Sequence, residues 1–343
     1  MPPPALGPDA CDPVLVMGAG SIGGWLGGRL AAADVPVVMV GRPRTLDAMR
    51  ARGLTLTDCD GGRLHLPPER LTLAESVPEG LRPGLALMCV KTAATPTAAA
   101  ELGEKLPAGT PVISMQNGLG NAARIAAAAP RLAALPGMVP YNVAELSPGH
   151  LHRGTGGRLA AQAHPALAPW WPVLQAAGLD VDVHEDLTAV QWGKLLLNLN
   201  NAVNALSGLP LRAQLLDRDL RRCTAALMRE TLRLLDRAGI VPARLSPLPP
   251  AWLPEVLSLP SPLFRAVAAR MLRIDDKARS SMADDLALGR VTEVDALNGE
   301  VLRLAAQLGL AAPVNARLVA LVHSWSRLSP PLGGPALREA LGV

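Results

Sequence analysis

A glycine-rich segment, Gly18-Ala19-Gly20-Ser21-Ile22-Gly23, follows the apolar run at residues 14–17 and precedes a stretch with helical spacing. Between a strand and a helix, such glycines permit a tight turn, close approach of the backbone to a pyrophosphate, and close helix packing. The amino-terminal end of the helix then faces the phosphates. The segment therefore predicts a dinucleotide site, contacted by Gly18, Ala19, Gly20, Ser21, Ile22 and Gly23. A glycine-rich turn without a ligand is the alternative.

The first half of the chain alternates short apolar runs with alanine-rich helical stretches. The runs are short enough, and apolar enough, to be strands of a parallel sheet that is buried on both faces. We expect strands at residues 14–17, 37–40, 85–90 and 112–115, and helices at 22–33, 96–106 and 121–129. Residues 138–162 carry turn signals between short extended pieces and are expected to complete the edge of this sheet. The pattern predicts an open α/β domain.

After residue 185 the pattern becomes almost entirely helical. A chain of 343 residues exceeds what a single core usually supports. We therefore expect an α/β domain at residues 1–185 and an all-helical domain at 186–343. Near the end of the second domain, apolar spacing predicts a helix from Thr292, which places Glu293 in the first helical turn.

The second expected strand ends at Val40 and is followed by Gly41 and Arg42. An NAD site usually has an acidic residue here for the ribose hydroxyls. In this chain Arg42, with Arg44 close behind it, offers cations for a 2′-phosphate instead. This predicts a preference for NADP(H), and a solvated surface arginine is the alternative.

Two more polar residues come directly after expected strands. Lys91 follows the run at 85–90, and Asn117 follows the run at 112–115. Ligands of doubly wound sheets bind at the carboxyl ends of the strands, so both residues are candidates for the cofactor site. Taken singly, Asn117-Gly118 is a common turn pair and Lys91 a common solvated lysine.

A line of polar residues runs through an otherwise apolar segment in the second half. Because Gln191, Lys194, Asn198 and Asn201 recur at helical spacing, they are expected to form one stripe of one buried helix. Burying an ammonium and several amides costs free energy unless polar groups hydrogen-bond or pair with them. A second polar segment contains Ser280, Ser281 and Glu293 and would supply such groups, together with an anionic substrate. The alternatives are a snorkelling lysine, helix-capping serines and a helix-start glutamate.

Composition argues against several other classes of protein. The net charge is +4, but aromatic residues make up only 2% of the chain, so stacking platforms for nucleic acid are poorly supplied. The cysteines are far apart and show no metal-ligand spacing, which favours reduced thiols in a cytoplasmic protein and no bound metal: Cys11, Cys59, Cys89 and Cys223. We see neither a signal peptide nor a run long enough to span a membrane.

These motifs together resemble the 2-dehydropantoate 2-reductases, also called ketopantoate reductases. The resemblance runs from the glycine segment through Lys91, Asn117 and the WGKLLLN motif around Lys194 to residues 278–299. It implies an N-terminal Rossmann domain, an all-α C-terminal domain and an active site in the cleft between them. It also implies reduction of ketopantoate to (R)-pantoate by NADPH, a step toward pantothenate and coenzyme A, and by analogy a homodimer.

The resemblance assigns roles to single residues. Lys194 is implied as the general acid, and Asn198, Ser281 and Glu293 as residues that hold the substrate. Lys91 and Asn117 are implied on the cofactor side, where they help to orient the reacting centre. These roles agree with the chemistry, because hydride transfer leaves negative charge on the carbonyl oxygen, and a positioned proton donor stabilises it. Glu293 is expected to act with Lys194 in catalysis.

One position departs from the family pattern. The family commonly has a second asparagine eight residues after the lysine, where this chain has Ala202. Asn201 lies on the lysine stripe and is expected to bind the substrate in its place. The departure motivates one alternative, a paralogue acting on another 2-oxo or 2-hydroxy acid. A non-catalytic NADP(H) sensor is a further alternative, against which the intact set of Lys194, Asn198, Ser281 and Glu293 argues.

Overall fold

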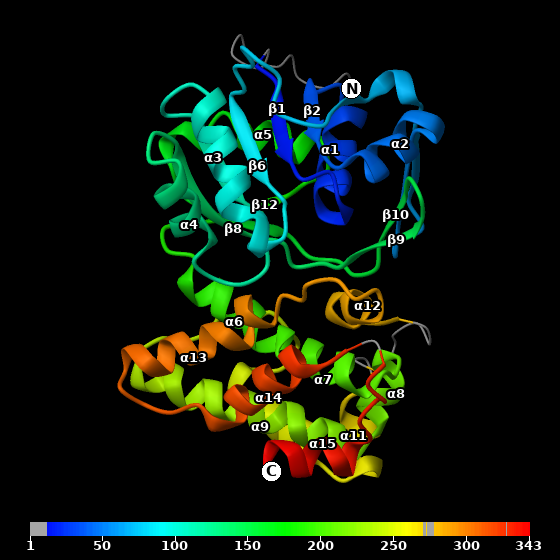
Figure 1. The fold of residues 1–343 in the computed structure, drawn as a ribbon, viewed down its shortest axis with the longest axis vertical. Coiled ribbons are helices and arrows are strands. Elements are labelled where there is room, and N and C mark those ends of the chain that lie inside the picture. The colour runs from blue at the N-terminus through cyan, green and yellow to red at the C-terminus, as the bar shows by residue number, and fades with distance from the viewer. Residues whose placement is uncertain (1–11, 270–271, 273–277, 327) are drawn as a thin grey trace. The chain divides into compact units, whose positions relative to one another are not determined.

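The computed structural model describes residues 12–269, 272, 278–326 and 328–343. The chain forms two compact units, the first ending at Leu187 and the second beginning at Thr188 (Figure 1). The first unit is a parallel-sheet α/β structure and the second is helical, which confirms the predicted fold class.

The described part of the first unit contains an eight-stranded sheet in the order β12-β11-β8-β7-β6-β1-β2-β5. The six strands from β5 to β8 in this order are parallel, whereas β11 pairs antiparallel with β8. The chain passes from β1 to β2 and β5 on one side, then returns to β6 on the other side of β1. The carboxyl ends of β1 and β6 therefore form the switch point at which open α/β sheets bind ligands. The strands are β1 (Val14–Met17), β2 (Val37–Val40), β5 (Thr72–Ala74), β6 (Leu85–Met88), β7 (Pro111–Ser114), β8 (Ala133–Met138), β11 (Leu159–Gln162) and β12 (Val181–His184).

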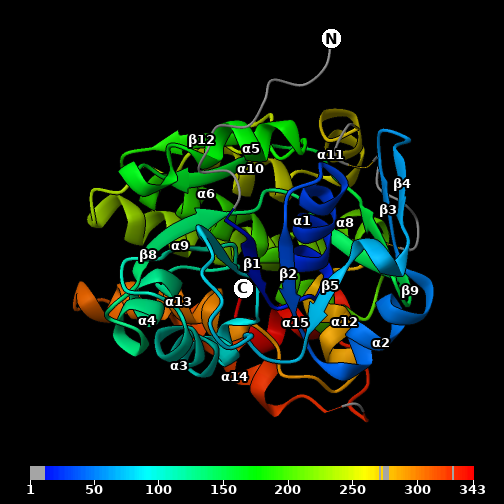
Figure 2. The same ribbon diagram turned by 90° about the horizontal axis from the view of Figure 1, so that it is seen from above.

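Helices cover both faces of this sheet (Figure 2). Side chains of successive residues in a strand point to opposite faces, so Val14 and Val16 enter one core while Leu15 and Met17 enter the other. The first core also contains residues of α1 (Ser21–Ala32) and α5 (Trp170–Ala176). The second contains residues of α3 (Thr95–Lys105) and α4 (Asn121–Ala128). Burial on both faces explains why these strands are continuous apolar runs.

A second, four-stranded sheet in the order β4-β3-β10-β9 belongs to the described part of the first unit. It packs on α1, where a Cβ at Gly24 would lie 2.8 Å from Leu151 and one at Gly28 would lie 2.7 Å from Leu54. The prediction that residues 138–162 complete the edge of one sheet is therefore wrong for β9 and β10. Strand β10 pairs with β3, nearly 100 residues away in the chain, and the local pattern does not encode that pairing. The strands are β3 (Leu54–Asp58), β4 (Arg63–Leu66), β9 (Val143–Ser147) and β10 (His150–Arg153), and α2 (Pro43–Arg52) precedes β3.

The second unit is arranged around the helix α9 (Arg218–Arg237), which packs against α7, α8, α10, α13, α14 and α15. This helix begins at Asp217, whose carboxylate accepts the backbone N–H of Asp219 at 2.8 Å and of Leu220 at 3.0 Å. The other helices are α6 (Thr188–Asn198), α7 (Asn200–Ser207), α8 (Leu211–Leu216), α10 (Leu253–Ser258), α11 (Ser261–Val267), α12 (Ser281–Ala287), α13 (Asn298–Gln307), α14 (Pro313–Ser324) and α15 (Gly334–Leu341).

Arg221 on α9 is fully buried and connects several helices of this unit. Its guanidinium carbon lies 4.1 Å from the ring centroid of Phe264 on α11. The guanidinium also donates hydrogen bonds to backbone carbonyls that end α8 and α10 and to one hydroxyl: Leu215 O, Leu216 O, Leu257 O, Leu259 O and Ser261 Oγ. A single side chain therefore satisfies helix ends that would otherwise be buried without partners.

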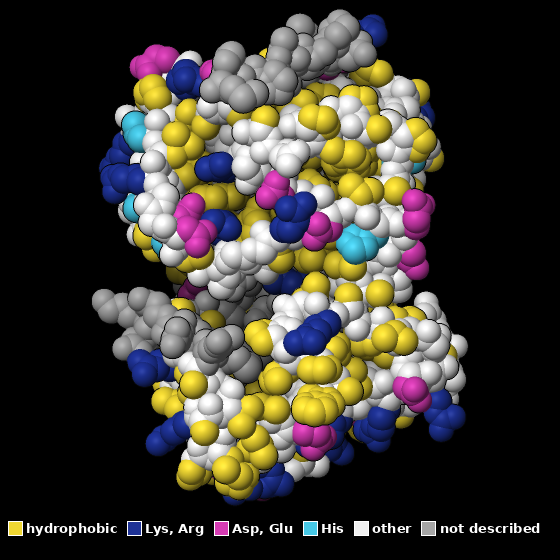
Figure 3. Space-filling view, turned by 180° about the vertical axis from the view of Figure 1, so that it is seen from behind, with side chains coloured by type: hydrophobic (Ala, Val, Ile, Leu, Met, Phe, Trp, Pro, Cys, Tyr) yellow, Lys and Arg dark blue, Asp and Glu magenta, His cyan; other side chains and the backbone are white. Residues whose placement is uncertain are grey.

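On the face drawn in Figure 3, Lys and Arg lie singly or in small groups among hydrophobic and acidic side chains. This face therefore has no continuous basic patch. None of the described helices is long and apolar enough to cross a membrane. Within the described residues there is also no group of three His, Cys, Asp or Glu arranged to hold a metal ion. Cys59, Cys89 and Cys223 are unpaired thiols, and Cys11 lies outside the described residues.

Candidate active site

The glycine segment forms the turn between β1 and α1, and its three glycines differ in what surrounds them. Gly18 has φ of 108°, and a Cβ there would lie 2.7 Å from the backbone nitrogen of Val90. A Cβ at Gly23 would lie 2.0 Å from the carbonyl oxygen of Gly18. Gly20 is exposed, and a Cβ there would meet nothing within 4 Å. The open side of Gly20 fits the close approach of a dinucleotide pyrophosphate.

The amino-terminal end of α1 supplies donors at the same place. No side chain caps this helix, and no acidic residue occupies its first turn. Ser21 and Ile22 are partly exposed, so the first backbone amides of α1 lie near the surface. The turn itself is anchored to β2, because Gly18 N–H and Ala19 N–H both donate to Val40 O, at 2.9 and 2.8 Å. An anionic cofactor group suits such a helix end.

The carboxyl end of β2 leads directly to Arg42. Gly41 packs on the glycine segment, since a Cβ at Gly41 would lie 2.9 Å from the Cβ of Ala19. Arg42 precedes the first residue of α2, and both Arg42 and Arg44 are exposed. Arg42 therefore directly follows a residue that packs on the glycine turn, and Arg44 lies two residues further along.

The ends of β6 and β7 lie next to this turn and are linked by a residue that the sequence did not single out. Gln116 is buried, and its Nε2 donates to Val90 O at 2.8 Å and to Thr95 Oγ1 at 2.7 Å. Its Oε1 accepts from Ser114 Oγ at 2.9 Å. Gln116 thus joins the loop that carries Lys91, which is exposed, to the loop that carries Asn117.

Asn117 also takes part in this connection through its backbone. Its carbonyl oxygen accepts from Asn121 Nδ2 at 2.9 Å and from Thr92 Oγ1 at 3.4 Å. The structure therefore gathers the glycine turn, Arg42, Lys91 and Asn117 at the carboxyl edge of the main sheet.

In the second unit, the polar stripe predicted on one helix is divided between two. Helix α6 ends at Asn198 and α7 begins at Asn200, so Asn201 belongs to the second helix. The prediction of one continuous helix is wrong at Leu199. The backbone of Leu199 still has right-handed helical angles and donates to Leu195 O at 3.0 Å. Directly after the break, Asn200 exchanges hydrogen bonds with Gln214 and accepts one from Thr224 Oγ1.

Lys194 lies on α6 and is half-buried, with Asn198 one turn further along and 9% exposed. Burial lowers the pKa of the Lys194 ammonium from 10.5 to about 8. The residue before it, Gly193, leaves no room for a side chain, because a Cβ there would lie 2.4 Å from Ala243 O. The segment ending at Ala243 is held against α6 by a 2.8 Å hydrogen bond from its N–H to Ala189 O. A lysine with this pKa can both donate and accept a proton near neutral pH.

The start of α12 is tied to α7 through Ser280 and not through the predicted Ser281. Ser280 Oγ accepts from Ala283 N–H at 3.1 Å as the cap of α12 and donates to Asn201 O at 3.1 Å. Ser280 N–H donates to Oδ1 of the fully buried Asn204 at 2.9 Å. Ser281 is exposed at the first position of α12. The backbone of Asn201 and the side chain of Ser281 are thereby held in one part of the second unit.

Asn204 is a second residue that sequence reasoning did not assign. Its Nδ2 donates to Leu209 O at 2.9 Å and to Gln214 Oε1 at 3.4 Å, so both ends of its amide are used within the unit. The signal that could have identified it is its position three residues after Asn201 on the same helical spacing.

Glu293 does not occupy the first turn of an α-helix, so this prediction is wrong. It precedes the 3₁₀ turn at Val294–Ala296, and α13 begins only at Asn298. Leu297 between them has φ −110° and ψ −86°, which interrupts the helical backbone. The Glu293 carbonyl accepts from Ala296 N–H at 3.0 Å and from Leu297 N–H at 3.1 Å, and the residue is partly exposed.

The doubly wound sheet, the open glycine turn and the uncapped start of α1 are the features of a dinucleotide-binding α/β unit. Such a unit followed by a helical unit is the architecture of a class of oxidoreductases. Comparison with known families makes the assignment specific. Residues 14–166 match the model described as "Ketopantoate reductase PanE/ApbA", and residues 186–326 match "Ketopantoate reductase PanE/ApbA C terminal". The chain belongs to the ketopantoate reductase family and is an oxidoreductase.

Individual relatives are similar over most of their length. The 2-dehydropantoate 2-reductase of Halobacterium salinarum is 30% identical, covering 92% of this chain and 99% of its own. That of Pyrococcus horikoshii is 26% identical, covering 92% and 98%.

Two solved structures extend the comparison. A PanE/ApbA family ketopantoate reductase from Ralstonia eutropha superposes with a TM-score of 0.76 at 26% identity, covering 91% of this chain and 97% of its own. D-mandelate dehydrogenase in complex with NADH and anilino(oxo)acetate superposes with a TM-score of 0.74 at 18% identity. The match covers 96% of this chain and 100% of that chain, so the two share the fold.

Proposed function

We propose that this chain reduces 2-dehydropantoate to (R)-pantoate with NADPH, a step toward pantothenate and coenzyme A. Membership of the ketopantoate reductase family across both units supports the reaction class. The observation that carries the chemistry is the half-buried Lys194, with a pKa of about 8. We also infer that the reaction takes place in the cytoplasm, and that the enzyme is a homodimer.

The residues of the first unit fit a bound dinucleotide. In this proposal the open side of Gly20 and the first amides of α1 receive the pyrophosphate, while Lys91 and Asn117 border the nicotinamide end. When bound, NADPH supplies the hydride that is added to the carbonyl carbon of the 2-oxo acid. The chain itself has to hold the oxo acid and provide the proton.

Lys194 has the property needed for the proton transfer. Negative charge develops on the carbonyl oxygen as hydride arrives, and the Lys194 ammonium stabilises that charge and donates a proton from Nζ. In this proposal Asn198, Asn201 and Ser281 hold the substrate, and Glu293 favours the protonated form of the lysine. In the oxidation direction, neutral Lys194 takes the proton back.

The predicted pH dependence follows from the pKa of Lys194. The protonated form is the acid, so kcat for reduction is expected to be level below pH 8 and to fall about tenfold per unit above it. Oxidation of the hydroxy acid needs the neutral amine and is expected to rise through the same pH. Initial rates in both directions between about pH 6 and 10 test this. Parallel profiles in the two directions would contradict it.

The preference for NADPH is predicted to depend on Arg42. A 2′-phosphate beside the exposed Arg42 and Arg44 gains charge-assisted hydrogen bonds that NADH cannot make. Arg42→Ala is therefore expected to lower kcat/KM for NADPH by about 10–100-fold and to leave NADH nearly unchanged. Arg52→Ala, at the exposed far end of α2, is the matched control. An unchanged NADPH-to-NADH ratio in Arg42→Ala would refute the assignment.

Another 2-oxo acid is the second candidate substrate, and one observation favours it. Ala202 stands where the family commonly has asparagine, and it is fully buried on α7. Asn201 is partly exposed, so its amide reaches from a different position. The contacts at the far end of the substrate would therefore differ from those of the family.

NADPH oxidation by the purified chain with ketopantoate and with other branched and unbranched 2-oxo acids tests the proposal. A clear preference for ketopantoate supports the pantothenate assignment. Preference for another acid keeps the mechanism and replaces the substrate. NADPH binding without turnover on any of them would make the chain a cofactor sensor.

A further inference from the structure

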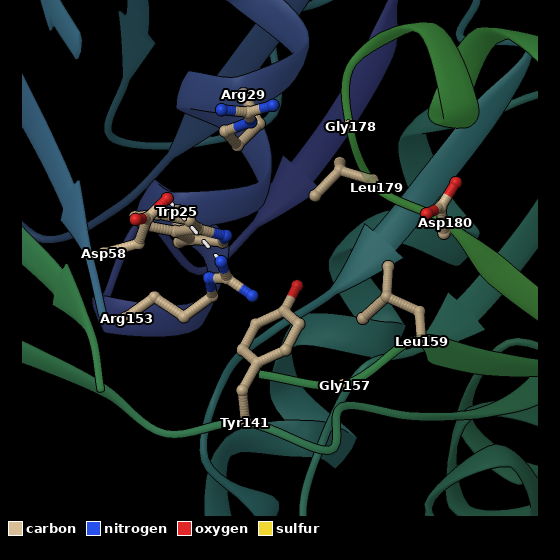
Figure 4. Close-up of a pocket in the computed structure, with 10 residues that line it drawn as sticks. All are labelled: Trp25, Arg29, Asp58, Tyr141, Arg153, Gly157, Leu159, Gly178, Leu179 and Asp180. Atoms are coloured by element: carbon tan, nitrogen blue, oxygen red, sulfur yellow. Dashed lines mark ion pairs between the residues drawn. The ribbon is translucent and has the colours of Figure 1, made fainter. Parts of the chain in front are cut away.

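The first unit contains a pocket of about 230 Å³ whose lining residues differ from those proposed for the active site. It is bounded by α1, by the segment that follows α5, and by the chain that enters and leaves the second sheet (Figure 4). All of its lining residues belong to the first unit, and none of them is among the residues proposed above for cofactor or substrate. The side chains that determine its chemistry are Tyr141, Arg153, Arg29 and Trp25.

Tyr141 presents a polar group to this pocket. The residue is only 5% exposed, and no described group accepts a hydrogen bond from its hydroxyl. Figure 4 shows the hydroxyl pointing into the pocket between Arg153 and Leu159. Burial raises the pKa of Tyr141, and the charge of Arg153 and the indole N–H of Trp25 oppose the shift. An indole N–H is only a donor, so the phenol keeps its own proton and can donate it. A buried hydroxyl hydrogen without an acceptor is costly, which makes it the first observation that points to a ligand.

Arg153 provides the second observation. Its guanidinium carbon lies 5.8 Å from the ring centroid of Trp25 and 5.7 Å from that of Tyr141. One end of the guanidinium is held by Asp60 at 2.7 Å and Asp58 at 3.5 Å. Its Nε is buried and has no hydrogen-bond partner in the described part of the chain. The side chain is therefore fixed in position while one of its donors remains unsatisfied.

Arg29 brings positive charge to the opposite wall. Its Nε donates to Ala177 O at 2.9 Å, and a Cβ at Gly178 would lie 2.0 Å from its Nη2. Gly178 thus leaves room for the guanidinium. Arg29 makes no ion pair with a carboxylate of the described residues, so its charge is not neutralised by a direct partner.

The two carboxylates at the pocket have partners of their own. Asp58 accepts from the backbone N–H groups of Asp60 and Gly62, at 3.0 and 2.8 Å, besides pairing with Arg153. Asp180 pairs with Arg158 at 3.2 Å. The groups that still lack partners are donors, which selects for a ligand with acceptor atoms and negative charge.

We propose that this pocket is a binding site for a small carboxylic acid, separate from the active site. The carboxylate accepts from the Tyr141 hydroxyl and from the Arg153 guanidinium, while the positive charge of Arg29 on the opposite wall attracts the anion without a direct hydrogen bond. The hydrocarbon part of the ligand lies against Leu159, Leu179 and the ring of Trp25. The volume is suited to an acid of a few carbon atoms rather than to a nucleotide.

The composition of the chain provides a specific probe of the pocket, because Tyr141 is its only tyrosine. The full chain labelled with ¹³C-tyrosine is titrated with propionate, and the ring signals of Tyr141 are followed by NMR. A saturable shift is expected in the wild type, and Arg29→Gln is expected to weaken binding about 10-fold. Arg82→Gln, an exposed arginine elsewhere in the unit, is the matched control and should bind as the wild type does.

Two further variants establish where propionate binds. Lys194→Ala should leave the Tyr141 titration unchanged, because propionate bound at the proposed active site would be sensitive to that lysine. Tyr141→Phe, followed by calorimetry, should weaken the binding of propionate. No saturable shift in the wild type would mean that water alone satisfies Tyr141 and Arg153, and would overturn the proposal. Equal affinity in Arg29→Gln would overturn it as well.

Discussion

Replacing Lys194 by alanine is expected to lower kcat for reduction of the 2-oxo acid by about 10²–10⁴-fold, the usual contribution of a positioned general acid. The affinity for NADPH should be largely kept, because the residues proposed to hold the dinucleotide are on other elements. Steady-state rates and a separate titration of NADPH fluorescence measure the two effects.

Two controls distinguish a loss of turnover from a loss of NADPH binding or of folding. Lys105→Ala removes another of the few lysines, at the end of α3 and far along the chain from the glycine segment, and should turn over normally. The variant Lys194→Ala should also lose the fall in rate above pH 8 that the wild type shows. Turnover at the wild-type rate in Lys194→Ala would remove the proposed mechanism while leaving the fold and the cofactor site intact.

Replacing Arg221 by alanine is expected to lower the free energy of unfolding by about 3–5 kcal/mol. The substitution leaves the carbonyl oxygens at the ends of α8 and α10 without their donors, in a fully buried place. It also removes the stacking on Phe264. Denaturant unfolding followed by the helical circular dichroism signal measures the loss.

Arg222 is the matched control, because it directly follows Arg221 on α9 but is exposed. Arg222→Ala is expected to change stability by no more than about 0.5 kcal/mol. Arg221→Lys should fall between the two, because an ammonium keeps the charge and loses the flat geometry that reaches several carbonyls. Similar stabilities for Arg221→Ala and Arg222→Ala would show that the buried hydrogen bonds contribute little.

The strands of the main sheet were predictable because each is buried on both faces. The expected strands at 14–17 and 37–40 are confirmed, and those at 85–90 and 112–115 are confirmed with small shifts at their ends. Helices α1, α3 and α4 begin within one residue of their expected positions. Continuous apolar runs and glycine turns are local signals, so one sequence is enough to identify them.

The second sheet was not predictable for the opposite reason. Its strands are partly exposed, and β10 joins β3 through a pairing across most of the first unit. Glycines on α1 make room for it, which appears in the sequence only as a helix with unusually many glycines. The breaks at Leu199 and Leu297 were missed as well, because the apolar spacing continues through both places while the helices end there.

The candidate site shows the same division. Residues that follow strands, such as Lys91 and Asn117, were predictable because topology brings strand ends together. Gln116 and Asn204 were not assigned, because a buried amide that joins two loops has no sequence signal of its own. Ser281 and Glu293 were candidates from their polar segment, but their roles came from the family resemblance and stay predictions.

The glycine segment has a consequence for how its pattern is interpreted in other sequences. Gly18 and Gly23 are required by the fold itself, since any side chain there would collide with backbone, whereas Gly20 faces open space. Two of the three motif positions therefore report that the chain can form this turn, and only one reports that something binds to it. A descendant that lost its cofactor would be expected to keep Gly18 and Gly23 and to let Gly20 vary. Gly20→Ala is accordingly the substitution that separates ligand affinity from foldability.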